Sequence, residues 1–476
     1  MRGNQISIMI QRMRYVATDL VTTALAIFAF NIFRYFLMEM HERGGLLLGE
    51  FLAQSTIIAE QILLPVGLLG IYWWSGYYNS PFSRSRVEEF QSTMISSVVS
   101  AALIYFSLLI NDPLPARTQS YELLIVLWGC LFLFTYVGRL ILTTSSIRHL
   151  RERDWFFNTI IVGDSDHALS TASRLENLPT NLGYNIVGHV HIEGEQSASA
   201  TFTVLDDGQV DRLARTHNID QIVLVPVPGT SEEKVMQLLF KYFSTGVPVR
   251  MAPTSLAFLT SHIRLGDIIS EPMIDLTAPA MNELQRNTKR IMDVLFSAAA
   301  LLLLSPLYLA LAILVKTTSK GPVIYRQERV GYRQKPFRIL KFRSMRVDAE
   351  ANGPQLSDET DPRITPLGKV MRKYRLDELP QFWNVLKGDM SLVGPRPERA
   401  YFIEQIVREA PYYTLIHQVK PGITSWGMVK FGYARSVAEM VERTRYDLIY
   451  LSNMSVGVDI KILLHTIKTV LLGRGL

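Results

Sequence analysis

The sequence predicts a membrane protein of three parts. These are four transmembrane helices within residues 1–147, a Rossmann-like α/β domain over 155–270, and a C-terminal α/β domain over 289–476 that contains a re-entrant membrane helix. Apolar residues make up 48% of the chain and charged residues only 19%, an apolar-rich balance for a soluble protein. The apolar excess is confined to the region before Arg148 and to 291–315. A chain of 476 residues is also too long for one hydrophobic core.

Four apolar segments precede Arg148, and each is near the roughly 20 residues needed to cross a bilayer. They are Val16–Phe36, Ile62–Tyr78, Met94–Leu109 and Leu123–Leu142. The number of arginines alternates from one flank or loop to the next. Three precede the first segment, two lie between the second and third, and three follow the fourth: Arg2, Arg12, Arg14, Arg84, Arg86, Arg148, Arg151 and Arg153. The two other loops contain only Arg43 and Arg117. The positive-inside rule therefore places both ends of this block in the cytoplasm. The alternating loop charge disfavours buried soluble helices.

Short apolar strands and helices alternate from Thr159 to Met251, which predicts a parallel sheet. Gly163–His167 stands where a dinucleotide-binding fold would have its glycine-rich loop, but only the first glycine is present. Asp164 and Asp166 would repel a pyrophosphate. We therefore favour a structural or regulatory domain over a nucleotide site.

Residues 282–289 are polar and predict a linker, and 291–315 are apolar except for Asp293 and the Ser305–Pro306 pair. The apolar stretch is long enough to span a bilayer. Proline cannot donate a backbone hydrogen bond and would kink the helix. Arg290 and Lys316 flank the two ends with positive charge, as if both ends returned to one face of the membrane. We predict a re-entrant helix broken at Ser305–Pro306, with a fifth spanning helix as the alternative.

The stretch Leu376–Pro397 reads LDELPQFWNVLKGDMSLVGPRP. Asp377 and Glu378 precede Pro380, which suits the start of a helix that we expect over Gln381–Leu386. Carboxylates near a helix N-terminus tend to be ionised, so they can hold a metal or attack phosphorus. Because neighbouring helix residues do not share a face, both carboxylates can meet one substrate only from the turn before the helix.

Four cations are candidates for binding phosphate groups. Lys341 and Arg343 alternate on an extended segment, which puts both on one face, as clamping a diphosphate requires. Arg396 is held between two prolines, and Arg372 is either a phosphate ligand or a solvated helix residue. The net charge of +6 suits nucleic acid or anionic lipid, but the chain shows no nucleic-acid motif, so lipid is favoured.

The Leu376–Pro397 stretch resembles the signature of the bacterial sugar transferases, the monotopic phosphoglycosyl transferases. Lys341–Met345 (KFRSM), Asp361–Thr365 and Val419–Thr424 are similar to other blocks of that family, in the same order. The resemblance is close from Lys289 onward. The earlier part resembles the large subclass, which has four membrane helices and a Rossmann-like middle domain.

The resemblance implies a catalytic C-terminal domain on the cytoplasmic face of the bacterial inner membrane. It implies transfer of a sugar 1-phosphate from a UDP-sugar to polyprenyl (undecaprenyl) phosphate with release of UMP, the first membrane step of exopolysaccharide, capsule or O-antigen synthesis. Asp377 would attack phosphorus, and Glu378, with Asp377, would hold Mg2+ or orient the pair. The oligomeric state is open, with a homodimer as one alternative. An inactive regulator or scaffold, and a glycosyltransferase releasing UDP, are the competing functions.

Two features of the C-terminal region leave questions open. After PGIT the family commonly has GW and a polar segment ending in Asn-Gly-Arg, whereas Ser425–Tyr433 reads SWGMVKFGY, so sugar selectivity is not carried over from relatives. Ile460, Leu463, Leu464, Ile467 and Leu471 share a helix face near Lys461 and Lys468. This predicts either an interfacial membrane helix or an amphipathic helix packed on the domain.

Overall fold

The computed structural model describes residues 8–39, 47–79, 86–109, 117–152, 154–177, 183–193, 196, 203–216, 219–227, 229–243, 245–252, 274–275, 280–351, 353, 355–356 and 361–472. The chain divides into two compact units. One comprises 1–158, 172–185 and 262–272, and the other comprises 159–171, 186–261 and 273–476. Arg2, Arg43, Arg84 and Arg153, which served to predict the orientation of the membrane segments, lie outside the described residues.

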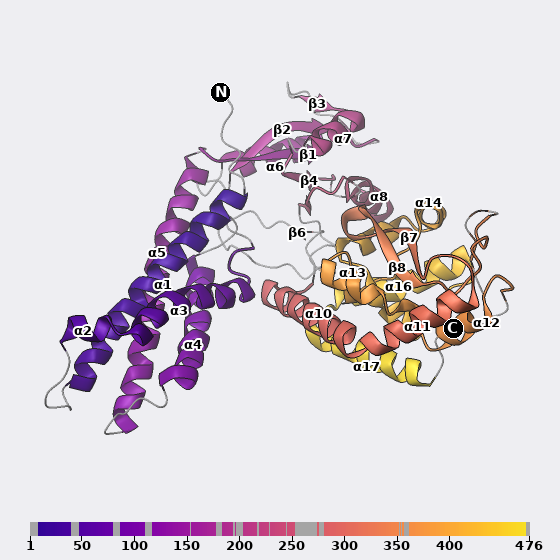
Figure 1. Ribbon diagram of the computed structural model, residues 1–476. Helices are drawn as coiled ribbons and strands as arrows, with labels where there is room; N and C mark the ends of the chain where they lie inside the picture. The colour runs from indigo at the N-terminus through magenta and orange to yellow at the C-terminus, as the bar shows by residue number, and fades with distance from the viewer. Residues whose placement is uncertain are drawn as a thin grey trace. The chain divides into compact units, whose positions relative to one another are not determined.

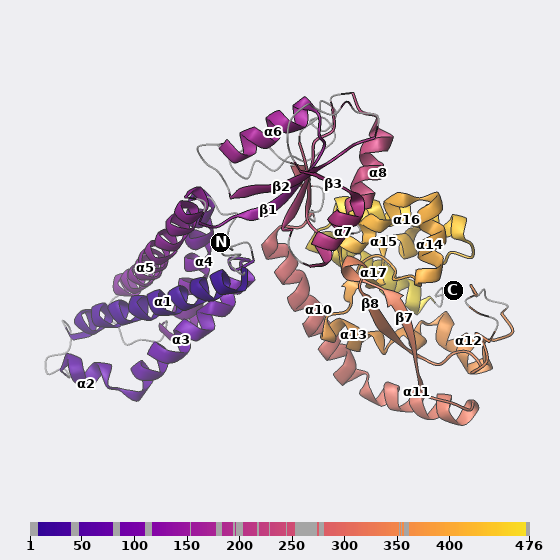
Figure 2. The same ribbon diagram turned by 90° about the horizontal axis from the view of Figure 1, so that it is seen from above.

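The first unit contains four helices that are long and apolar enough to cross a membrane, as predicted. They lie side by side in Figures 1 and 2: α1 (Ile8–Glu39), α3 (Ser55–Trp74), α4 (Arg86–Ile104) with its π-helical end η1 (Tyr105–Leu109), and α5 (Arg117–Arg151). A short helix, α2 (Leu48–Leu52), precedes α3. Helices α1 and α5 are longer than the predicted segments because their polar ends continue the helix.

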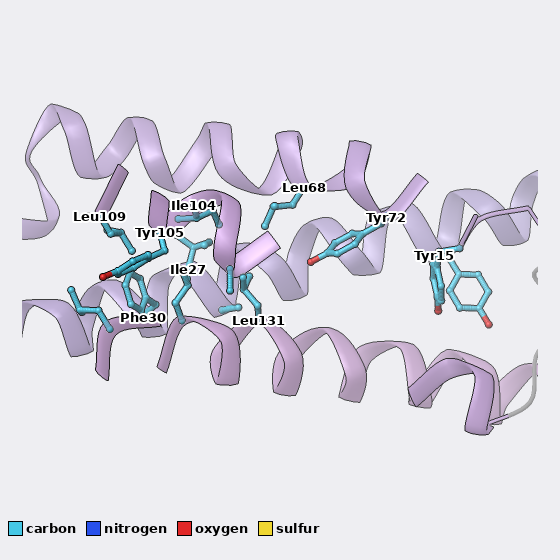
Figure 3. Close-up of a cluster of buried hydrophobic side chains, with 14 of the residues drawn as sticks. Tyr15, Ile27, Phe30, Leu68, Tyr72, Ile104, Tyr105, Leu109 and Leu131 are labelled. Atoms are coloured by element: carbon cyan, nitrogen blue, oxygen red, sulfur yellow. The ribbon is translucent and has the colours of Figure 1, made fainter. Parts of the chain in front are cut away.

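The four helices bury a narrow apolar seam that includes Ile27, Phe30, Leu68, Ile104 and Leu131 (Figure 3). Less than half of each span is buried. Most of the apolar surface is therefore left for contact with lipid.

A fully buried ion pair crosses this helix block. The Nε and one terminal nitrogen of Arg139 donate to the two carboxylate oxygens of Asp19 at 2.8 and 2.7 Å. Tyr78 also donates to Asp19 at 2.8 Å, and Arg139 donates to Thr93 at 3.0 Å. The Arg139 guanidinium lies 3.6 Å from the centre of the Tyr77 ring. The pair joins α1, α4, α5 and the segment after α3, and its hydrogen bonds offset the desolvation of both charges.

The strands between Phe157 and Asp275 form a six-stranded sheet in the order β3-β2-β1-β4-β5-β6, and the division of the chain into three domains stays a prediction. The pairs β2–β3, β1–β4 and β4–β5 are parallel, and β6 is antiparallel to β5. The strands are Phe157–Val162, Tyr184–Val190, Val204–Leu205, Gln221–Leu224, Val249–Met251 and Ile274–Asp275, and the helices α6, α7 and α8 are Asp166–Asn177, Asp207–Arg215 and Glu232–Phe243. The predicted parallel sheet is confirmed, whereas its likeness to a dinucleotide-binding fold stays a prediction.

Gly163 has a packing role in this sheet. Its φ is +136°, and an added Cβ would lie 2.6 Å from the carbonyl oxygen of Val225. Asp164 is buried and bonded to His191 at 2.8 Å. The remaining glycine of the incomplete fingerprint is thus needed by the fold itself, and the structural or regulatory role of this region stays a prediction.

The C-terminal domain begins with two helices, α10 (Glu283–Leu303) and α11 (Ser305–Thr318), which are bent by 62° at the predicted break (Figure 2). The strands β7 (Ile324–Val330) and β8 (Pro336–Phe342) form a hairpin through the 3-10 turn η2 (Tyr332–Gln334), and β9 (Ser391–Val393) pairs in parallel with β10 (Gly422–Thr424). The other elements are α12 (Pro366–Lys373), η3 (Leu376–Glu378), α13 (Gln381–Lys387), α14 (Ala400–Glu409), η4 (Pro411–Gln418), α15 (Trp426–Lys430), α16 (Val437–Ser452) and α17 (Val456–Leu471).

The residues 282–289 are not the predicted linker. Asn282 caps α10 by accepting a hydrogen bond from the backbone N–H of Gln285 at 2.8 Å, so the polar stretch forms the first turns of the helix. Arg290 donates to the carbonyls of Val385 and Leu386 at the end of α13, and Asp293 accepts the backbone N–H of Leu392 at 2.9 Å. These contacts fix α10 to the domain, whereas the re-entrant placement in a membrane stays a prediction.

Candidate active site

The two carboxylates lie in a single 3-10 turn, η3, directly before α13. Arg375 opens this turn with a left-handed backbone (φ +52°), and its carbonyl accepts the backbone N–H of Glu378. Pro380 caps α13, and Gly388 ends it with φ +97°. Asp377 and Glu378 are only 6% and 4% exposed. The structure confirms the predicted short helix and the place of both carboxylates in the turn before it.

Three cations from different parts of the chain converge on Glu378. Nζ of Lys341, on β8, lies 3.0 Å from Oε1, and a terminal nitrogen of Arg396 lies 3.5 Å from the same atom. A terminal nitrogen of Arg375 lies 3.8 Å from Oε2. Burial opposes ionisation of Glu378, but these three cations hold its pKa well below the ordinary value.

Asp377 differs from its neighbour in its electrostatic environment. Burial raises the pKa of the Asp377 carboxyl, Lys341 and Arg372 oppose this rise, and the charge of Glu378 adds to it. The pair therefore contains one firmly ionised carboxylate and one that holds its proton more readily.

The side chains of Arg372 and Arg343 make different contacts in the structure. Arg372 lies on α12, and its Nε donates to Ser344 at 3.1 Å while its charge acts on Asp377. Arg343 follows the end of β8, and its guanidinium donates to Pro322 O, to Ser319 O at 2.7 Å and to Ser319 Oγ at 2.8 Å. The expectation that Lys341 and Arg343 face one substrate is corrected, because Arg343 binds the end of α11 and is not brought to the carboxylate pair.

Asn384 fixes the distance between Lys341 and the carboxylates. Its side-chain amide donates to Arg338 O at 2.8 Å and accepts the backbone N–H of Leu340 at 3.0 Å. This pair of bonds ties α13 to β8 one residue before Lys341. The sequence analysis missed Asn384, because its position in the short helix gives no sign of a contact with a distant strand.

Glu398 holds the turn that presents Arg396. It binds Arg329 at 3.0 Å and Arg443 at 2.7 Å, and Arg329 also donates to Pro397 O at 3.2 Å. The sequence analysis missed this residue too, and the available signal was an acid directly after the Pro-Arg-Pro turn.

Two glycines allow the segment around Gly394 and the segment around Gly422 to pack closely against each other. An added Cβ on Gly394 would lie 2.3 Å from Lys420 O, and one on Gly422 would lie 2.1 Å from the backbone nitrogen of Gly394. The backbone N–H of Gly422 donates to Pro395 O at 3.0 Å. The close approach of the two segments fixes the frame of Arg396.

Comparison with known proteins gives the family. The family model described as "Bacterial sugar transferase" matches residues 284–473. The "UDP-glucose:undecaprenyl-phosphate glucose-1-phosphate transferase" of Escherichia coli (strain K12) is 31% identical over 431 residues, which cover 88% of this chain and 89% of that protein. The chain belongs to the bacterial sugar transferase family.

Other sugar transferases match shorter stretches of the chain at higher identity. The "UDP-N-acetylgalactosamine-undecaprenyl-phosphate N-acetylgalactosaminephosphotransferase" of Aeromonas hydrophila is 49% identical over 187 residues, 39% of this chain and 44% of that protein. The "Putative undecaprenyl-phosphate N-acetylgalactosaminyl 1-phosphate transferase" of Bacillus subtilis is 48% identical over 126 residues, 26% of this chain and 70% of that protein. The family model begins within the first turn of α10 and so includes every residue of the site.

Proposed function

We propose that this bacterial sugar transferase moves a sugar 1-phosphate from a UDP-sugar to undecaprenyl phosphate and releases UMP. The product is undecaprenyl-diphosphate sugar, the starting point of exopolysaccharide, capsule or O-antigen synthesis. The observation that carries the proposal is the buried carboxylate pair facing Lys341, Arg375 and Arg396. Substrates with phosphate groups need such a surplus of cations, and relatives are named for this transfer.

The reaction proceeds in two displacements in this proposal. A carboxylate oxygen of Asp377 attacks the sugar-bearing phosphorus, a P–O bond forms, and the bond from that phosphorus to the bridging oxygen breaks, so UMP leaves with this oxygen. An oxygen of undecaprenyl phosphate then attacks the same phosphorus and frees Asp377. The three ion pairs described for the carboxylate turn end on Glu378 and none on Asp377, so we assign the anchoring role to Glu378 and the attack to Asp377.

The carboxylate pair also fits Mg2+. Oε2 of Glu378 is buried and has no hydrogen-bond partner among the described residues, and carboxylate oxygens are the ligands that Mg2+ takes, together with substrate phosphates. Glu378, with Asp377, would hold the ion. The ion would neutralise charge on the diphosphate and help UMP to leave.

We further propose that the domain is seated in the cytoplasmic leaflet of the inner membrane. The outer faces of α10 and α11 expose large apolar side chains, namely Leu295, Phe296, Leu302, Leu303, Leu309 and Ile313. The helix α17 exposes Ile460, Leu464, Ile467 and Leu471 while it buries Ile462. These surfaces support a re-entrant α10–α11 pair and an interfacial α17 in contact with inner-membrane lipid. A homodimer stays an open alternative.

The nucleotide released distinguishes the three candidate functions. The purified full-length protein is mixed with undecaprenyl phosphate, Mg2+ and single UDP-sugars, and the released nucleotide is identified. We expect UMP, with release that depends on the lipid phosphate over many turnovers. Release of UDP would show a glycosyltransferase, and release of neither nucleotide with any UDP-sugar would favour a regulator or scaffold.

The covalent step predicts a labelled protein. With a donor labelled in the sugar and no lipid acceptor, label should remain on Asp377 after denaturation. Asp377→Asn should trap no label and should slow UMP release by about three orders of magnitude or more, because the nucleophile is lost. Peptide mapping and initial rates measure these outcomes. A folded Asp377→Asn protein with near-normal UMP release would refute the assignment.

A further inference from the structure

Arg375 has a backbone conformation that arginine seldom adopts. Its φ is +52° and its ψ is +26°, the left-handed region that normally favours glycine or asparagine. A residue held in this region at a functional site points to a role for the geometry it produces. Here the conformation begins the turn that carries both carboxylates, and it directs the arginine side chain toward Glu378.

The guanidinium of Arg375 is buried but poorly satisfied. Its side chain is only 11% exposed, and its nearest approach to Glu378 is 3.8 Å, too long for a hydrogen bond. Its Nε is buried and lacks a hydrogen-bond partner in the described chain. Buried donors of a charged group are normally satisfied, so this side chain is arranged for an anionic ligand.

Tyr433 holds this arginine beside a second one. Its ring centre lies 5.2 Å from the guanidinium carbon of Arg375 and 4.9 Å from that of Arg396. Aromatic rings attract cations at such distances, and one ring here contacts two guanidinium groups that would otherwise repel each other. Tyr433 belongs to the segment in which this chain departs from the common family sequence.

We infer that Arg375 binds the diphosphate of the sugar donor and that Tyr433 is the positioning residue that keeps Arg375 and Arg396 together as a clamp. The inference rests on the proposed function. Lys341, Arg375 and Arg396 face two carboxylates, so positive charge remains for a diphosphate even when both carboxylates are ionised. Two planar guanidinium groups offer paired donors that match phosphate oxygens.

The main test replaces Arg375 with glycine in the full-length enzyme. Glycine accepts the left-handed backbone, so Arg375→Gly removes the guanidinium without adding strain. Arg333→Gly is the matched control. Arg333 also has a φ of +53° and lies 5.3 Å from a tyrosine ring, that of Tyr332, but it is exposed and is not among the described cations that pair with Glu378.

We expect Arg375→Gly to raise the KM for the UDP-sugar by about tenfold or more. The variant should also lose most of the rise in the thermal unfolding midpoint that UDP gives the wild type, a readout independent of turnover. Arg333→Gly should match the wild type in both measurements. Arg375→Asn, which tolerates the same backbone and is neutral, should repeat the result and decides the matter if the glycine variant does not fold.

The positioning role of Tyr433 has its own pair of variants. Tyr433→Leu should raise the KM for the donor by about threefold or more with a smaller change in kcat, because the ring no longer holds the two arginines. Tyr433→Phe keeps the ring and should restore the wild-type KM.

The outcomes separate this inference from the proposed function. A wild-type protein that releases no UMP contradicts the proposed function. If the wild type does release UMP and both Arg375 variants keep the KM and the UDP response of Arg333→Gly, the clamp is refuted while the proposed function stands. Equal KM values for Tyr433→Leu and Tyr433→Phe would refute the positioning role of the ring.

Discussion

Lys341 is the cation with the shortest ion pair to the carboxylate turn. Its Nζ lies 3.0 Å from Glu378, and its charge lowers the pKa of both Glu378 and Asp377. Burial lowers the pKa of Lys341 itself, and the two carboxylates oppose this change. Lys341 thus favours the ionised form of both carboxylates.

Replacing Lys341 should shift the pH profile of the enzyme. In the proposed reaction Asp377 attacks only when ionised, so activity should fall as the pH drops through its pKa, which burial already raises. Lys341→Met removes a charge that lowers this pKa, so the acid limb of kcat should move to higher pH. The measurement is UMP release against pH, with Lys335→Met, an exposed lysine of the same hairpin, as the control. An acid limb that stays at the same pH in both variants would contradict the prediction.

Sequence motifs located Asp377, Glu378, Lys341 and Arg396, because each stands in a block whose spacing fixes a turn or a strand. They did not locate Arg375 or exclude Arg343. Alternation predicts the direction of a side chain only within a strand, and β8 ends at Phe342, one residue before Arg343. The left-handed backbone of Arg375 cannot be foreseen, because sequence signals for this conformation come from glycine and asparagine.

At the scale of elements, the buried pair of Asp19 and Arg139 should govern the stability of the helix block. Asp19→Leu or Arg139→Leu alone should lower the free energy of unfolding by about 3–5 kcal/mol, because one buried charge is left uncompensated. The double variant should recover most of this loss. Unfolding in detergent measures these values.

The partly exposed pair of Arg34 and Glu60, 3.1 Å apart, is a suitable comparison. Glu60→Gln should cost less than the single variants at Asp19 and Arg139, because this pair is less deeply buried than theirs. Single variants at Asp19 and Arg139 that are no more harmful than Glu60→Gln would show that the buried pair is structurally dispensable.

The break between α10 and α11 predicts a labelling pattern. In a Cys130→Ala background, Leu284→Cys and Lys320→Cys place exposed thiols near the two ends of the helix pair. Both should resist a membrane-impermeant thiol reagent added to intact cells and should react after the membrane is opened. Leu47→Cys, between the first two apolar helices, should react from outside and serves as the positive control. Labelling of Lys320→Cys from outside would show that α10 and α11 span the membrane.

Periodicity and proline positions predicted most elements, including the four apolar helices, the parallel strands and the break near Ser305. Periodicity and proline positions did not predict the features that depend on single polar or charged residues. The mean hydropathy of a segment of about 20 residues hides single charged residues such as Asp19 and Arg139. Apolar segments alone therefore do not predict their ion pair. The polar composition of residues 282–289 predicts a linker, yet Asn282 caps the first turn of α10 and Arg290 anchors the helix to α13.

For the whole molecule, the site contacts predict that the chemistry resides in the C-terminal domain. Among the residues that the structure describes, the cations that pair with Glu378 all come from the segment 341–396. Residues 280–476 alone, purified in detergent, should therefore release UMP, with the full chain as the reference. If this segment is folded but inactive, the earlier domains take a direct part in the reaction.

Asp19 and Arg139 also constrain how the protein is made. They are 120 residues apart, and at about 5–20 residues per second Asp19 leaves the ribosome on the order of ten seconds before its partner. Throughout that interval α1 carries an uncompensated carboxylate, which is costly inside a lipid bilayer. We therefore expect α1 to be stable in the bilayer only once α5, which carries Arg139, lies beside it.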